Sequence, residues 1–140
     1  MQAGQLAPTF RLEDQNGGFA VLIDLVRLGP LVISFHRGLW CRHCALALEA
    51  LARVDAEIRA FGARHVAIGP PFSGRQDLPM PLLADPGARV ARAYGLSAEI
   101  PATFVIDGNG LIVLAAIDPD YRNRLDPKDV LSALRCLSRR

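Results

Sequence analysis

The amino-acid sequence predicts one α/β domain, spanning residues 1–140, in which a central mixed β-sheet carries helices on both faces. Hydrophobic residues make up 51% of the 140 residues, which is enough for one core. Apolar runs typical of strands alternate with segments of helical periodicity, and short Gly-, Asn- and Asp-rich turns separate them. No repeat, low-complexity block or charge run divides the chain. This alternation favours a sheet covered by helices on each side.

The first expected element is an N-terminal β-hairpin. Its strands, Phe10–Leu12 and Phe19–Leu22, flank a turn made of Asn16, Gly17 and Gly18. A helix follows. The next strand, Leu31–Phe35, is a nearly continuous apolar run, which is typical of a strand buried on both faces.

A long helix is expected after a pair of cysteines. One apolar stripe recurs along it at steps of four and three residues, and Gly62 ends it. The stripe consists of Ala47, Leu51, Val54, Ile58 and Phe61. Val66–Ile68 is a short strand, and the Pro- and Gly-rich segment Gly69–Pro81 is a loop.

The second half of the chain holds a further helix and a second hairpin. Asp85-Pro86 caps and opens a helix that Gly95 closes. The strands Thr103–Ile106 and Leu111–Ile117 form a second hairpin around Asp107–Gly110.

The last predicted element is a helix that Asp126-Pro127 caps. Cys136 lies in it beside Leu137, where a partly buried, unreactive thiol is the ordinary interpretation and a role as a resolving cysteine is the alternative. The core-facing residues of this helix are Val130, Leu131, Leu134 and Leu137.

Charge and hydropathy exclude two classes of partner. The net charge is only +2, and the arginines at the end, Arg135, Arg139 and Arg140, are interpreted as a solvated helix tail; no nucleic acid is expected. No apolar stretch is long enough to cross a bilayer, so no membrane partner is expected. The first residues lack the pattern of a secretory signal, and a cytoplasmic protein is therefore expected.

The pair Cys41-x-x-Cys44 carries the chemistry. A buried strand runs into a short loop, and the helix begins at the cysteines. Two thiols at this spacing can close a small disulfide, which is typical of catalytic redox motifs in reducing compartments. A zinc site is the alternative, but the remaining ligands show no second Cys-x-x-Cys, and no metal is expected. Those remaining ligands are Cys136, His36, His43 and His65.

Several features near the cysteines favour a thiolate. The positive end of the helix dipole faces them, and Arg37, Arg42 and His43 add positive charge. These effects lower the pKa of the attacking thiol from its usual value near 8.5 to about 7. Trp40 is interpreted as a wall of the site, and His36 as a packed or surface histidine.

A second segment bears on the same site. Pro101 directly precedes the apolar strand that contains Thr103, and this arrangement predicts a cis peptide bond packed against the cysteines. The alternative is a trans proline that only opens the strand.

Together, these segments resemble the peroxiredoxin-like branch of the alkyl hydroperoxide reductase/thiol-specific antioxidant (AhpC/TSA) family, within the thioredoxin-like superfamily. The resemblance covers most of the chain. It rests on Phe10-x-Leu12…Gly17-Gly18, Arg37-Gly38-Leu39-Trp40-Cys41-x-x-Cys44, Leu83-Ala84-Asp85-Pro86…Ala93-Tyr94-Gly95 and Phe104-Val105-Ile106-Asp107-x-x-Gly110. It implies a thioredoxin-like fold and, in the superfamily, a proline loop that shapes the substrate groove.

The resemblance also assigns positions. The family's peroxidatic cysteine falls at Cys44, its threonine at Cys41 and its proline at Arg37. The family's peroxide-activating arginine falls at Pro101, and a second family arginine matches Arg124. The chain therefore combines the peroxiredoxin scaffold with the cysteine pair and proline of thioredoxins, and Arg37 is a substitute for binding an anion or peroxide.

The expected function is that of a peroxiredoxin-like thiol oxidoreductase with antioxidant activity. It reduces hydroperoxides through Cys41 and Cys44, is recycled by a thioredoxin- or glutathione-type reductant, and needs no cofactor. Two alternatives stay open: a thioredoxin-like disulfide oxidoreductase acting on a disulfide substrate, and a redox-sensing or binding protein without turnover. Which cysteine attacks first, and whether the chain forms a homodimer, also stay open.

Overall fold

The computed structural model describes residues 2–37, 42–70, 78–96, 101–117 and 126–139, apart from the side chain of residue 43. Within these ranges a seven-stranded sheet has the order β2-β1-β5-β4-β3-β6-β7. β4 pairs in parallel with β3 and β5, and the other pairings are antiparallel, so the predicted mixed sheet is confirmed. The strands are β1 Arg11–Asp14, β2 Phe19–Val21, β3 Leu31–Phe35, β4 Arg64–Gly69, β5 Leu82–Ala84, β6 Ala102–Ile106 and β7 Ile112–Ile117.

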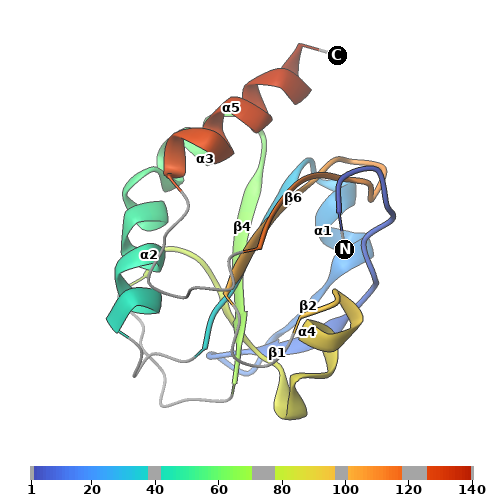
Figure 1. The fold of residues 1–140 in the computed structure, drawn as a ribbon, viewed down its shortest axis with the longest axis vertical. Coiled ribbons are helices and arrows are strands. Elements are labelled where there is room, and N and C mark those ends of the chain that lie inside the picture. The colour runs from blue at the N-terminus through green and yellow to red at the C-terminus, as the bar shows by residue number, and fades with distance from the viewer. Residues whose placement is uncertain (1, 38–41, 71–77, 97–100, 118–125, 140) are drawn as a thin grey trace.

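Helices cover both faces of this sheet, as predicted (Figure 1). One face carries α1 (Leu22–Arg27) and α4 (Arg89–Ala93). The other carries α2 (Arg42–Arg53), α3 (Asp55–Ala60) and α5 (Pro127–Ser138). Each face has its own core because residues of a strand alternate between the two sides.

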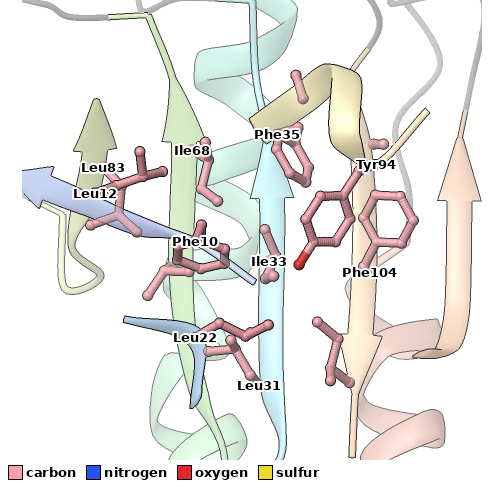
Figure 2. Packing of buried hydrophobic residues seen from close by; sticks show 14 of the residues in the cluster. Phe10, Leu12, Leu22, Leu31, Ile33, Phe35, Ile68, Leu83, Tyr94 and Phe104 are labelled. Atoms are coloured by element: carbon pink, nitrogen blue, oxygen red, sulfur yellow. The ribbon is translucent and has the colours of Figure 1, made fainter. Parts of the chain in front are cut away.

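The core under α1 and α4 centres on three aromatic rings, shown in Figure 2. Ring centroids lie 5.1 Å apart for Phe35 and Tyr94, 5.8 Å for Phe35 and Phe104, and 5.3 Å for Tyr94 and Phe104. Phe35 and Phe104 come from the paired strands β3 and β6, and Tyr94 follows α4. The tilted and edge-on ring geometries are those that aromatic pairs prefer.

Turn and cap chemistry explains where several elements meet. Gly17 has a φ of +86°, and the Asp14 carboxylate accepts from the backbone N–H groups of Asn16 and Gly18, which confirms the first hairpin. β1 begins at Arg11, one residue later than predicted, and extends to Asp14 because its end also pairs with β5. The second hairpin is confirmed as well, with β6 antiparallel to β7.

The predicted long helix is two helices in the structure. Val54 interrupts it with φ −104° and ψ 12°, and its N–H bonds to the Leu51 carbonyl, three residues back. This tight turn ends α2, and α3 begins at Asp55. Leu51 and Ile58 still pack in one cluster, so the apolar stripe was interpreted correctly although the helix breaks.

The sequence interpretation missed β5, the three residues Leu82–Ala84, which pair with β4 on one side and β1 on the other. The helix expected at Asp85-Pro86 begins at Arg89, after a 3₁₀ turn. Asp85 still caps it, because its carboxylate accepts from the N–H groups of Val90 and Ala91, both at 3.0 Å. The predicted capping role of Asp85 is therefore confirmed, and the predicted start of the helix at Pro86 is wrong.

The last helix begins as predicted, since the Asp126 carboxylate accepts from the Lys128 N–H at 2.9 Å. Cys136 on this helix is exposed, not partly buried. It lies about 200° around the helix from the buried Leu134, on the face directed away from the core. Within the described part of the chain, no helix is both long and apolar enough to cross a membrane.

Candidate functional site

The site lies where the end of β3 meets the beginning of α2. β3 is buried along its whole length and leads into His36 and Arg37, and α2 begins at Arg42. Cys44 is the third residue of α2 and therefore lies in its first turn. Trp40 and Cys41 lie outside the described residues.

The Cys44 thiol lies in a setting that favours its anion. Burial opposes ionisation, since only 3% of the residue is exposed, but the Cys44 Sγ accepts a hydrogen bond from the backbone N–H of Arg37 at 3.4 Å. The first turn of α2 holds no acidic residue, so the positive end of the helix dipole is not neutralised by its own side chains. A backbone donor and a helix N-terminus both stabilise a thiolate over a thiol.

The predicted cations are only partly placed at this sulfur. Arg37 is half-buried and reaches Cys44 through its backbone. Arg42 is exposed at the start of α2. His43 belongs to the same helical turn, and its side chain lies outside the described part, as does all of Arg124.

The proline segment is described from Pro101 onward. Pro101 is half-buried directly before β6, and its peptide bond to Ile100 lies outside the described residues, so the cis prediction stays a prediction. Thr103 is buried in β6 and pairs with Ser34 of the central strand β3.

A buried pair of polar side chains links two neighbouring strands on the face of the sheet that α2 covers. Ser34 Oγ and His65 Nε2 are 2.8 Å apart, linking β3 to β4. Burial lowers the pKa of His65 to about 4, so its imidazole is neutral near pH 7. Ser34 and Thr103 are directly paired and so project on the same face. This face thus combines apolar packing with buried polar side chains.

His36 is a site residue that the sequence interpretation did not select. It is 7% exposed, burial lowers its pKa to about 4, and neither ring nitrogen has a hydrogen-bond partner in the described structure. Its ring lies against Gly69, where a Cβ would be 2.5 Å from Nε2 and 2.7 Å from Nδ1. A glycine at the end of a buried strand indicates such a close approach, and this signal was available in the sequence. No group of three or more His, Cys, Asp or Glu side chains suited to a metal gathers among the described residues.

Curated relatives are redox proteins of two kinds. The chain is 28% identical to peroxiredoxin Q, chloroplastic, of Oryza sativa subsp. japonica over 138 residues, covering 89% of this chain and 61% of that protein. It thus spans about 61% of the length of the peroxiredoxin Q relatives. It is 25% identical to the thiol-disulfide oxidoreductase ResA of Bacillus cereus (strain ATCC 10987 / NRS 248) over 121 residues, covering 81% of this chain and 68% of that protein.

Solved structures confirm the thioredoxin-like fold. Peroxidoxin BcpB from Mycobacterium tuberculosis superposes with a TM-score of 0.83 at 23% identity, covering 98% of each chain. The mitochondrial 2-cys peroxiredoxin from Plasmodium falciparum gives a TM-score of 0.83 at 13% identity, covering 96% of this chain and 92% of that one. A model of the AhpC/TSA family matches residues 3–115, which is most of the chain. The resemblance read from the motifs is therefore confirmed, and the chain belongs to the AhpC/TSA family.

Proposed function

We propose that this chain reduces hydroperoxides, with Cys44 as the attacking thiolate and Cys41 as the resolving thiol. The observation that carries the proposal is the setting of the Cys44 sulfur, in the first turn of α2 with the Arg37 N–H donating to it. Cys44 is also only 3% exposed, and this burial favours a small oxidant over a folded protein as its reaction partner. The peroxiredoxin Q relatives support the same activity.

The first step is a two-electron oxidation of Cys44. Its thiolate attacks the terminal oxygen of the hydroperoxide, and the O–O bond breaks. The sulfur becomes a sulfenic acid that keeps the hydroxyl, and the other oxygen leaves as an alkoxide or hydroxide that takes a proton from water. The backbone donor of Arg37 and the end of α2 favour this step by keeping Cys44 ionised.

The second step closes the cycle. The Cys41 thiol attacks the sulfenic sulfur, water leaves, and a disulfide joins the two cysteines. An external dithiol or two monothiols, of the thioredoxin or glutathione type, return both cysteines to thiols by exchange. A reducing, cytoplasmic environment provides such donors.

Thiol–disulfide exchange is the second candidate function. The ResA relative supports it, and so does the Cys-x-x-Cys spacing. In this function Cys41, at the helix start, attacks a disulfide, and the buried Cys44 resolves the mixed disulfide.

Single-cysteine variants test the proposal. With hydrogen peroxide and dithiothreitol, Cys44→Ser should lose peroxide consumption down to the background rate because the nucleophile is gone. Without dithiothreitol, Cys41→Ser should still react once and accumulate a sulfenic acid on Cys44, detected by dimedone trapping and peptide mass.

Cys136→Ser is the matched control, because this exposed thiol on α5 has no part in the cycle. It should keep the wild-type rate. Full peroxide consumption by Cys44→Ser would contradict the assignment. Rapid reduction of insulin disulfides by a wild type that leaves peroxide untouched would favour the second candidate function.

A further inference from the structure

His36 is a buried polar group without a structural explanation. Its residue is 7% exposed, and both ring nitrogens lack a hydrogen-bond partner within the described residues. The other buried histidine, His65, differs because its Nε2 bonds to Ser34 and only its Nδ1 lacks a partner among the described residues. Buried polar atoms nearly always have a hydrogen-bond partner. An imidazole in which both nitrogens lack one therefore indicates a ligand that hydrogen-bonds to the ring when it binds.

The backbone brings His36 close to the reactive sulfur. The His36 N–H bonds to the Ile68 carbonyl at 3.0 Å and extends the pairing of β3 with β4. The next residue, Arg37, donates its N–H to Cys44 Sγ. His36 is therefore one residue away from the group that contacts the thiol.

The packing of α2 on β4 places the ring on the same side as Cys44. Leu48 of α2 and Ala67 of β4 belong to one packed cluster. Cys44 precedes Leu48 by four residues, about 6 Å along the helix, and Gly69 follows Ala67 by two, about 6.6 Å along the strand. Because α2 runs back from the end of β3 along the parallel strands β3 and β4, these two offsets bring Cys44 to the level of Gly69, on the side of the sheet where the His36 ring lies.

From this arrangement we propose that His36 is a substrate-contacting residue that donates a hydrogen bond to the leaving oxygen of the hydroperoxide while Cys44 attacks. The inference rests on the proposed peroxide reduction.

The chemistry needs only a neutral imidazole. Burial keeps the pKa of His36 near 4, so at neutral pH one ring nitrogen donates and the other accepts. As sulfur bonds to the terminal oxygen and the O–O bond breaks, negative charge gathers on the leaving oxygen, and the hydrogen bond to it strengthens. The leaving oxygen takes its proton from water, so His36 begins and ends the step neutral.

The test compares two reactions of the same thiol. His36→Phe keeps a ring over Gly69 and removes both nitrogens. We expect its second-order rate with hydrogen peroxide, measured by dimedone trapping with Cys41→Ser present in all the compared proteins, to fall about a hundred- to a thousandfold, the effect of removing one preorganised donor. Alkylation of Cys44 by iodoacetamide, which breaks no O–O bond, should keep its wild-type rate at the same pH.

Two further variants control for folding and position. Gly69→Ala keeps the imidazole but forces it aside, since the new Cβ would lie 2.5 Å from Nε2, and should slow the peroxide reaction in the same direction. His65→Phe changes the other buried histidine, which lies four residues before Gly69, about 13 Å away along β4. It should leave the ratio of the peroxide rate to the alkylation rate unchanged.

Three results would overturn the inference. Peroxide and alkylation rates that fall together in His36→Phe would show that the ring only supports the thiolate. Unchanged peroxide rates in both His36→Phe and Gly69→Ala would show packing alone. A wild type that does not react with peroxide overturns the proposed function and this inference together, whereas either of the first two results, found beside a wild type that does react, overturns the inference only.

Discussion

The two faces of the sheet differ sharply at β3, the strand that leads into the site. Toward α1 and α4, Phe35 packs with Tyr94 and Phe104 in a fully buried aromatic cluster. Toward α2, the neighbouring residues Ser34 and His36 are equally buried but polar. Adjacent residues of one strand therefore serve different purposes.

This difference shows how a strand separates stability from chemistry. Successive side chains of β3 point to opposite faces, so an apolar core and a polar site share one backbone without sharing atoms. Changes on the aromatic face should therefore alter the free energy of unfolding and leave the thiol unaffected. Changes to the histidines on the face below α2 should alter how the free energy of unfolding depends on pH.

The largest expected effect is on the aromatic face. Phe104→Ala removes a fully buried ring between Phe35 and Tyr94, and we expect the free energy of unfolding to fall by about 3–5 kcal/mol. Urea unfolding followed by circular dichroism measures this loss. Iodoacetamide alkylation of Cys44, in conditions where the variant is folded, should keep its rate. A changed alkylation rate would contradict the inference that the aromatic face does not affect the Cys44 thiol.

The second effect belongs to the polar face. The folded pKa values of His36 and His65 are about 4, below the unfolded value of 6.5, so the unfolded chain binds more protons between these values. The contribution of these histidines to the free energy of unfolding is therefore fully present above about pH 6.5. It is lost as the pH drops toward 4, by up to about 3 kcal/mol per histidine.

His65→Gln isolates one of these contributions, because carboxylates titrate alike in both proteins. The difference in unfolding free energy between wild type and variant should grow as the pH rises from 4 to 6.5 and be constant above it. A difference independent of pH would mean that His65 titrates alike in the folded and unfolded states.

The smallest effect concerns the one hydroxyl in the aromatic cluster. The Tyr94 hydroxyl donates to the Pro8 carbonyl at 2.8 Å and ties the N-terminal segment to the turn after α4. Tyr94→Phe should cost about 1 kcal/mol of unfolding free energy. Thermal unfolding checks the value, and a loss as large as that of Phe104→Ala would mean that the hydroxyl, not ring packing, holds this face.

The candidate site was partly readable from the residues alone. A buried strand followed within ten residues by a cysteine pair and an amphipathic helix predicts a thiol at a helix start, and Cys44 is found there. No local sequence pattern identifies the group that donates a hydrogen bond to the Cys44 thiol. The Arg37 N–H and the contact of His36 with Gly69 arise only when β3, β4 and α2 assemble.

The sequence by itself determined both hairpins and the cap of α5. These depend on residues close together in the chain: a glycine that accepts positive φ at 17, or a carboxylate two residues from the N–H that it caps, as in Asp126. In such segments all the groups that form the turn or cap lie within a few residues of one another, and no residue distant in the chain is needed.

Only the tertiary structure decided the remaining features. Leu82–Ala84 is too short to show a period and becomes β5 because β4 and β1 offer backbone partners on its two sides. The exposure of Cys136 follows from which face of α5 the sheet covers. In each case the deciding contacts join residues far apart in the chain, and a pattern of neighbouring residues does not specify those contacts.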